Sequence, residues 1–155
     1  MSDDQRVKDK YIWVEPKRYT MGTYANLIPP DPNARKAVFW VERDKDKLFF
    51  VNSSAETLGL VKCGNIGNQS DDDGVYIIEE SAKSYIDVLP GEAVYIDEFD
   101  GYHDHCVYFT VSIRITSAKL GKVRFKTESK KGGCKRTVLF WDTGEVASHI
   151  SMSDE

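Results

Sequence analysis

Hydrophobic and polar residues alternate most regularly between residues 107 and 115 of this 155-residue chain. Five apolar residues are separated there by four residues that can face solvent, in the sequence VYFTVSIRI. Successive side chains of a β-strand point to opposite faces, so a period of two predicts a strand with one buried face. The same period recurs at residues 122–127, where Val123 and Phe125 are expected to face inward.

Shorter apolar runs, separated by turn residues, predict the remaining strands. They lie at residues 11–14, 37–41, 48–51, 58–63, 75–78, 84–89, 93–99 and 137–141. The runs at 37–41, 48–51 and 137–141 are apolar at consecutive positions, so both of their faces are expected to be covered. The proline-containing connector at 15–36 or a partner subunit would supply the second cover. No segment has the 3.6-residue period of a long amphipathic helix.

About nine or ten short strands in one domain predict an all-β fold. We expect a two-sheet antiparallel sandwich of immunoglobulin-like or jelly-roll type. A chain of this length buries roughly 68–70% of its unfolded surface, which is enough for one core. The expected organisation is a flexible N-terminus at 1–10, one domain at 11–142 and a polar tail at 143–155. The Cys…Trp…Cys pattern of antibody domains is absent.

The cysteines and the polar N-terminus predict a cytoplasmic protein. Cys63, Cys106 and Cys134 are odd in number and lack C-x-x-C spacing, as expected of reduced thiols. The start, MSDDQRVKDK, has no apolar core of a secretory signal. No apolar run approaches the ~20 residues of a membrane span, so no membrane partner is expected.

A His-x-His pair is the first candidate for chemistry. On an extended chain His103 and His105 project to the same side, and imidazole is a common ligand of zinc and iron. This motif resembles the metal-binding H-x-H of cupin barrels, although the glutamate that follows in cupins is replaced here by VYFT. The pair therefore predicts either a cupin-like metal-dependent enzyme or simply a polar loop that enters a strand. No other cofactor is expected.

No complete catalytic motif accompanies this pair. The chain lacks a G-x-S-x-G elbow, a glycine-rich phosphate loop and an H-E-x-x-H motif. We therefore expect a protein that is not an enzyme. Tyr19, Tyr24 and Tyr102 are expected in loops, where exposed rings could stack on sugars, so a carbohydrate-binding sandwich is a further alternative.

Charge is strongly segregated along the chain. Residues 71–104 contain eleven Asp or Glu and one Lys, whereas residues 119–136 contain eight Lys or Arg and one Glu. Lys122, Arg124 and Lys126 fall at alternating positions of one predicted strand, and Arg114 would lie beside them if the two strands form a hairpin. Because the net charge is −4 and aromatic residues are scarce in the basic segment, nucleic acid is an unlikely partner. The pattern favours binding to a protein with an acidic surface, or self-association.

Overall fold

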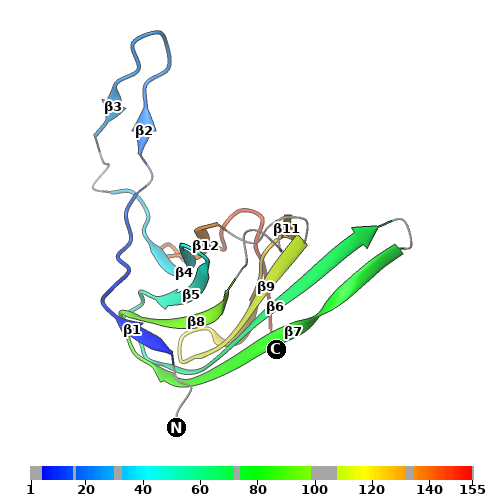
Figure 1. Cartoon of the computed structure of the whole chain (residues 1–155). Helices are drawn as coiled ribbons and strands as arrows, with labels where there is room; N and C mark the ends of the chain where they lie inside the picture. The colour runs from blue at the N-terminus through cyan, green and yellow to red at the C-terminus, as the bar shows by residue number, and fades with distance from the viewer. Residues whose placement is uncertain are drawn as a thin grey trace.

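The protein is an antiparallel two-sheet sandwich with a slender hairpin that stands away from its body (Figure 1). The structure, a computed structural model, describes residues 5–15, 17–29, 33–71, 74–98, 108–131 and 135–154. It confirms the all-β, two-sheet architecture that the sequence predicts. Within the described residues, no helix is long and apolar enough to cross a membrane.

The first sheet has five strands. In order across it they are β1 (Arg6–Lys8), β8 (Glu92–Glu98), β5 (Lys47–Asn52), β4 (Ala37–Asp44) and β12 (Thr137–Trp141). The second sheet has six strands. Five follow one another as β13 (Ser151–Asp154), β10 (Gly121–Lys126), β9 (Tyr108–Ser117), β6 (Leu58–Asp71) and β7 (Gly74–Val88), and β11 (Lys130–Lys131) also pairs with β9. The slender hairpin consists of β2 (Arg18–Tyr19) and β3 (Leu27–Ile28).

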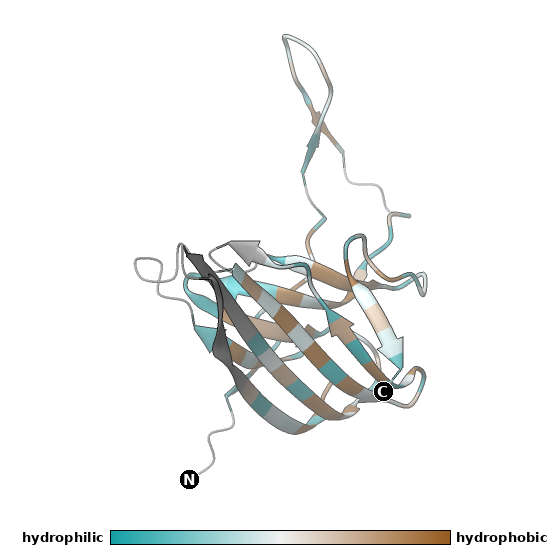
Figure 2. Ribbon diagram, turned by 90° about the vertical axis from the view of Figure 1, so that its right-hand side faces the viewer, coloured by the Kyte–Doolittle hydropathy of each residue, from teal (hydrophilic) through white to brown (hydrophobic). Residues whose placement is uncertain are grey.

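The main core lies between the two sheets and is built from the inward positions of their alternating strands. Phe39 stacks on Phe50 within the five-stranded sheet and meets Phe125 of β10 across the interior, at centroid distances of 5.8 and 6.1 Å. Val111, Ile113 and other inward residues of the six-stranded sheet complete this cluster. The period of two appears as alternating brown and teal bands along the strands (Figure 2).

Several elements differ from the sequence-based expectation. The runs at 75–78 and 84–89 belong to one long strand, β7, because intervening polar residues also pair with β6. The hairpin of β4 and β5 extends to Asp44 and Lys47, and it closes with the two-residue turn Lys45–Asp46, in which Lys45 adopts a positive φ of 56°. The irregular connector contains the hairpin β2–β3.

Both polar ends of the chain also contain strands. The expected strand at 11–14 is absent, and β1 forms instead within the segment expected to be flexible. Similarly, β13 lies within the polar tail and pairs with β10. Backbone hydrogen bonds need no apolar side chain, which explains why a hydrophobic pattern does not reveal these two strands.

The N-terminal segment covers the outer face of the five-stranded sheet. Its side chains Val7, Tyr11 and Trp13 pack on a second apolar cluster that includes Trp40 and Phe49. The cover expected for the apolar strands is therefore present, but it comes from the N-terminus rather than from residues 15–36.

Candidate functional site

Among its described side chains, the outer face of the six-stranded sheet carries five cations on three neighbouring strands. Lys62 of β6 lies directly opposite Arg114 of β9, and Arg114 lies directly opposite Arg124 of β10. Residues that pair across strands project to the same face. Lys122 and Lys126 share this face because they alternate with the inward-facing Val123 and Phe125. We call Lys62, Arg114, Lys122, Arg124 and Lys126 the basic face.

Three of these cations lack a carboxylate partner among the residues that the structure describes. Lys62, Lys122 and Lys126 are exposed and form no ion pair with any described residue. The half-buried Arg124 donates a hydrogen bond from Nε to the Ser112 hydroxyl at 2.8 Å, which anchors its guanidinium. Like charges that lie directly opposite each other on a sheet are generally destabilising.

The described side chains around the basic face are neutral, and two of them, Thr110 and Ser112, are buried. Where side chains are described, the other outward positions of the sheet hold Leu60, Gly64, Ala82, Ser84, Ile86, Tyr108, Thr110, Ser112, Thr116, Ser151 and Ser153. Ile86 is 67% exposed and provides a small apolar contact surface beside the cations. Tyr108 is the one aromatic residue in this set, and it lies six residues from Arg114 along β9, about 20 Å away.

The sequence-predicted interface residues therefore meet in space. Arg114, Lys122, Arg124 and Lys126 lie on one face because β9 and β10 form the hairpin on which that prediction depended. Lys62 was missed by sequence reasoning. It is a single cation within an apolar run, and only the pairing of β6 with β9 brings it next to Arg114.

The other sequence candidates do not form a described site. His103, His105 and Tyr102 lie outside the described residues, so the metal-site hypothesis remains untested. Among the residues that are described, no three His, Cys, Asp or Glu side chains gather as metal ligands. Tyr19 and Tyr24 are exposed on the slender hairpin, at 56% and 89% respectively.

The opposite outer face, on the five-stranded sheet, holds all three tryptophans. Trp13 makes edge contacts with Trp40 and Trp141 at centroid distances of 5.8 and 5.5 Å. Arg136 lies 4.7 Å above the Trp13 ring and forms a 3.3 Å ion pair with Glu42. These rings and charges contact one another, so we interpret the cluster as a structural cover of the five-stranded sheet.

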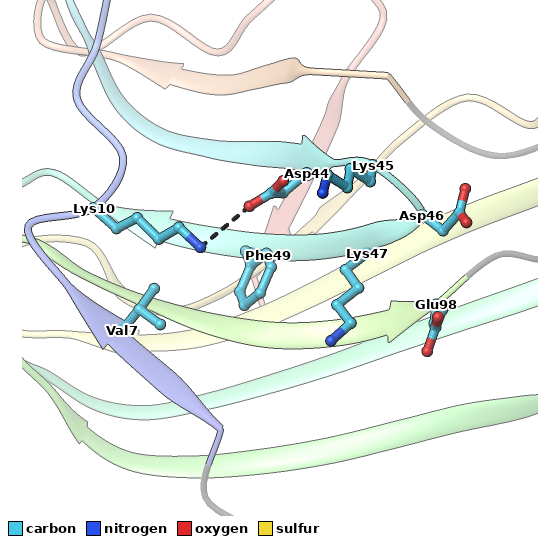
Figure 3. Close-up of a pocket in the computed structure, with 8 residues that line it drawn as sticks. All are labelled: Val7, Lys10, Asp44, Lys45, Asp46, Lys47, Phe49 and Glu98. Atoms are coloured by element: carbon cyan, nitrogen blue, oxygen red, sulfur yellow. Dashed lines mark ion pairs between the residues drawn. The ribbon is translucent and has the colours of Figure 1, made fainter.

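A shallow pocket of about 470 Å³ opens at the turn between β4 and β5 (Figure 3). Its walls combine Val7 and Phe49 with Lys10, Asp44, Lys45, Asp46, Lys47 and Glu98. Lys10 pairs with Asp44 at 3.3 Å, and the Tyr11 hydroxyl donates a hydrogen bond to the same carboxylate at 2.8 Å. Burial, together with this bond, raises the pKa of Tyr11, and the bond lowers the pKa of Asp44. Asp44 is thus held as an anion by two donors, and the charges of the pocket balance.

No protein-family model matches this chain, and neither curated proteins nor solved structures show a match. Its function has to be inferred from the arrangement of its residues. The basic face is the described surface on which cations of three neighbouring strands gather.

Proposed function

We propose that this protein is a non-enzymatic, cytoplasmic binding protein whose basic face binds an acidic surface of a protein partner. The observation that carries the proposal is that Lys62, Lys122 and Lys126 are exposed on one sheet face without a carboxylate partner among the described residues. Carboxylates of a protein partner placed over this face would complement these three charges. The buried, unpaired thiol of Cys63 is compatible with a reducing compartment.

The composition of the face favours a protein over a nucleic acid. Sheets that bind single-stranded nucleic acid stack bases on aromatic side chains. The described neighbours of these cations are instead small, hydroxylated or aliphatic, and Phe125 between Arg124 and Lys126 is fully buried. The chain also has a net charge of −4, which disfavours binding of a polyanion by the protein as a whole.

Binding of this kind has a distinct salt dependence. Exposed complementary charges mainly accelerate association and are screened by salt, with a Debye length of about 8 Å at physiological ionic strength. The partner should therefore associate faster at low salt. Ile86 and Leu60 would add the apolar contact that slows dissociation.

The test uses fluorescently labelled poly-L-glutamate as the acidic probe. Lys122→Glu, Arg124→Glu and Lys126→Glu are combined in the full chain, and probe affinity is measured by fluorescence anisotropy over a salt series. The matched control combines Lys8→Glu, Lys45→Glu and Lys47→Glu, three exposed lysines of the five-stranded sheet. Both variants change the net charge equally.

The basic-face variant should bind the probe at least roughly tenfold more weakly, a loss of about 1.4 kcal/mol, whereas the control should lose much less. Its melting temperature should stay close to that of the unchanged protein. Equal losses in both variants would mean that only net charge matters. A collapse in melting temperature of the basic-face variant would mean that these cations pair with the protein's own acidic residues, and the proposal would be wrong.

A further inference from the structure

The strand β13 forms the edge of the six-stranded sheet beside the basic face. It pairs antiparallel with β10, and its Ser153 and Ser151 lie opposite Arg124 and Lys126. All four of its side chains are exposed, so its attachment depends mainly on backbone hydrogen bonds. The residues opposite the two cations are neutral serines, although an acidic residue, Asp154, ends the strand.

The chain is anchored just before β13. Ala147 is buried and donates a backbone hydrogen bond to Leu139 at 3.0 Å, and Ile150 packs against the main core. Between them, His149 adopts a positive φ of 65°, a conformation that costs a residue with a side chain about 1–2 kcal/mol. The backbone hydrogen bond of Ala147 does not involve β10, so it can persist when residues 151–154 separate from β10.

We propose that the edge of β10 receives an extended acidic peptide, which pairs as an antiparallel strand in place of β13. This inference rests on the proposed function and specifies the partner. In strand addition, backbone hydrogen bonds supply affinity and alternate side chains supply specificity. Carboxylates at alternate positions would lie opposite Arg124 and Lys126, where β13 offers only serine hydroxyls. The preferred ligand is thus a segment with acidic residues two positions apart.

A reversible disulfide between β10 and β13 tests whether peptide binding requires β13 to separate from β10. Val123 and Asp154 lie directly opposite each other, within the Cα separation that a disulfide requires. The full chain with Val123→Cys and Asp154→Cys is compared in oxidised and reduced forms. The probe is a labelled peptide, IEMEDE, which repeats residues 150–155 with glutamate in place of both serines.

The reduced form should bind this peptide, and the oxidised form should bind at least roughly tenfold more weakly, because the tethered strand occupies the edge. The unchanged protein should bind the peptide with equal affinity under oxidising and reducing conditions. Equal binding by the locked and reduced forms would overturn the displacement of β13. If poly-L-glutamate still binds both forms in that case, the basic face keeps its proposed function. If the reduced form binds neither probe, the proposed function itself fails.

A second variant keeps the test decisive if the disulfide does not form. Ser151→Glu combined with Ser153→Glu places carboxylates of the chain's own strand opposite Lys126 and Arg124. This stronger internal strand should lower the affinity for the IEMEDE peptide several-fold. Unchanged or increased affinity would contradict the proposal.

Discussion

The two sheets differ in what covers their outer faces. On the five-stranded sheet, the N-terminal segment places Val7, Tyr11 and Trp13 over an apolar cluster. On the six-stranded sheet, the described outward positions hold cations among small and hydroxylated residues. One face is thus covered by the fold, whereas Lys62, Lys122 and Lys126 on the other face are exposed.

The pattern of apolar residues along the strands predicts this difference between the two sheets. β4 and β5 are apolar on consecutive positions, as in FWV and LFFV, so both of their faces need burial. β9 and β10 alternate strictly, so one of their faces tolerates water. If the comparison is correct, truncating a residue under the N-terminal cover should cost far more stability than truncating one on the basic side.

The largest effect is expected from Trp40→Ala. Trp40 is fully buried beneath the N-terminal cover, and its loss should cost about 3–5 kcal/mol of unfolding free energy. Urea denaturation measures this cost, with Thr116→Ala on the opposite outer face as the control, expected within about 0.5 kcal/mol. Similar small losses in both variants would mean that the two faces do not differ in this way.

A smaller loss, about 2 kcal/mol, is expected from Trp13→Ala. This half-buried ring belongs to the cover itself and contacts Trp40 and Trp141. Its removal should also speed amide hydrogen exchange in the segment that contains β1, because the cover would detach more often. Exchange that is unchanged in residues 5–15 would show that Trp13 does not secure the cover.

The bond between Tyr11 and Asp44 links the same cover to the β4–β5 turn, and it predicts a pH dependence. The folded-state pKa of Tyr11 is raised, mainly by burial, so its stabilising contribution is complete below its ordinary value near 10 and declines as pH rises above that value. The pKa of Asp44 is lowered, so the contribution of this carboxylate is complete above its ordinary value near 3.8 and declines as pH falls. Tyr11→Phe should therefore lower the urea midpoint modestly at pH 7, by less than Trp13→Ala.

The same comparison at pH 10.5–11.5 should show a smaller gap between Tyr11→Phe and the unchanged protein. Tyrosinate absorbance provides an independent check, because burial raises the pKa of both Tyr11 and Tyr95, so the unchanged protein should contain one more ionisation-resistant tyrosine than the Tyr11→Phe variant. A gap that widens with alkaline pH would contradict the sign of this linkage.

The smallest stability effect is expected on the basic face. Lys62→Glu places an anion opposite Arg114, so it should stabilise the sheet by about 0.2–0.5 kcal/mol while weakening poly-L-glutamate binding. Lys47→Glu is the matched single control. A large loss of stability in the Lys62 variant would indicate that this lysine has a structural role.

Much of the fold was predictable from local pattern, because apolar runs and their period report burial directly. The strands around Phe39, Phe50, Val111 and Phe125 follow from that signal. The strands β1 and β13 do not follow from it, because backbone pairing does not require an apolar pattern of side chains. The apolar strands predicted that a cover is needed, but not that Val7, Tyr11 and Trp13 supply it, because the contact between these distant segments is not visible in local pattern.

The candidate site was predictable only in part. Arg114, Lys122, Arg124 and Lys126 belong to consecutive strands, so a local hairpin suffices to bring them together. Lys62 joins them through pairing between strands that are about fifty residues apart, which one sequence does not reveal. The histidine pair lies outside the described residues and stays a prediction.

Lysine reactivity tests the central claim most directly. Acetylation rates of individual lysines are measured by mass spectrometry with and without poly-L-glutamate. Our account predicts that the probe slows acetylation of Lys62, Lys122 and Lys126 several-fold and leaves the exposed lysines of the five-stranded sheet, Lys8, Lys45 and Lys47, nearly unchanged. Equal protection of both sets, or protection of the second set alone, would contradict it.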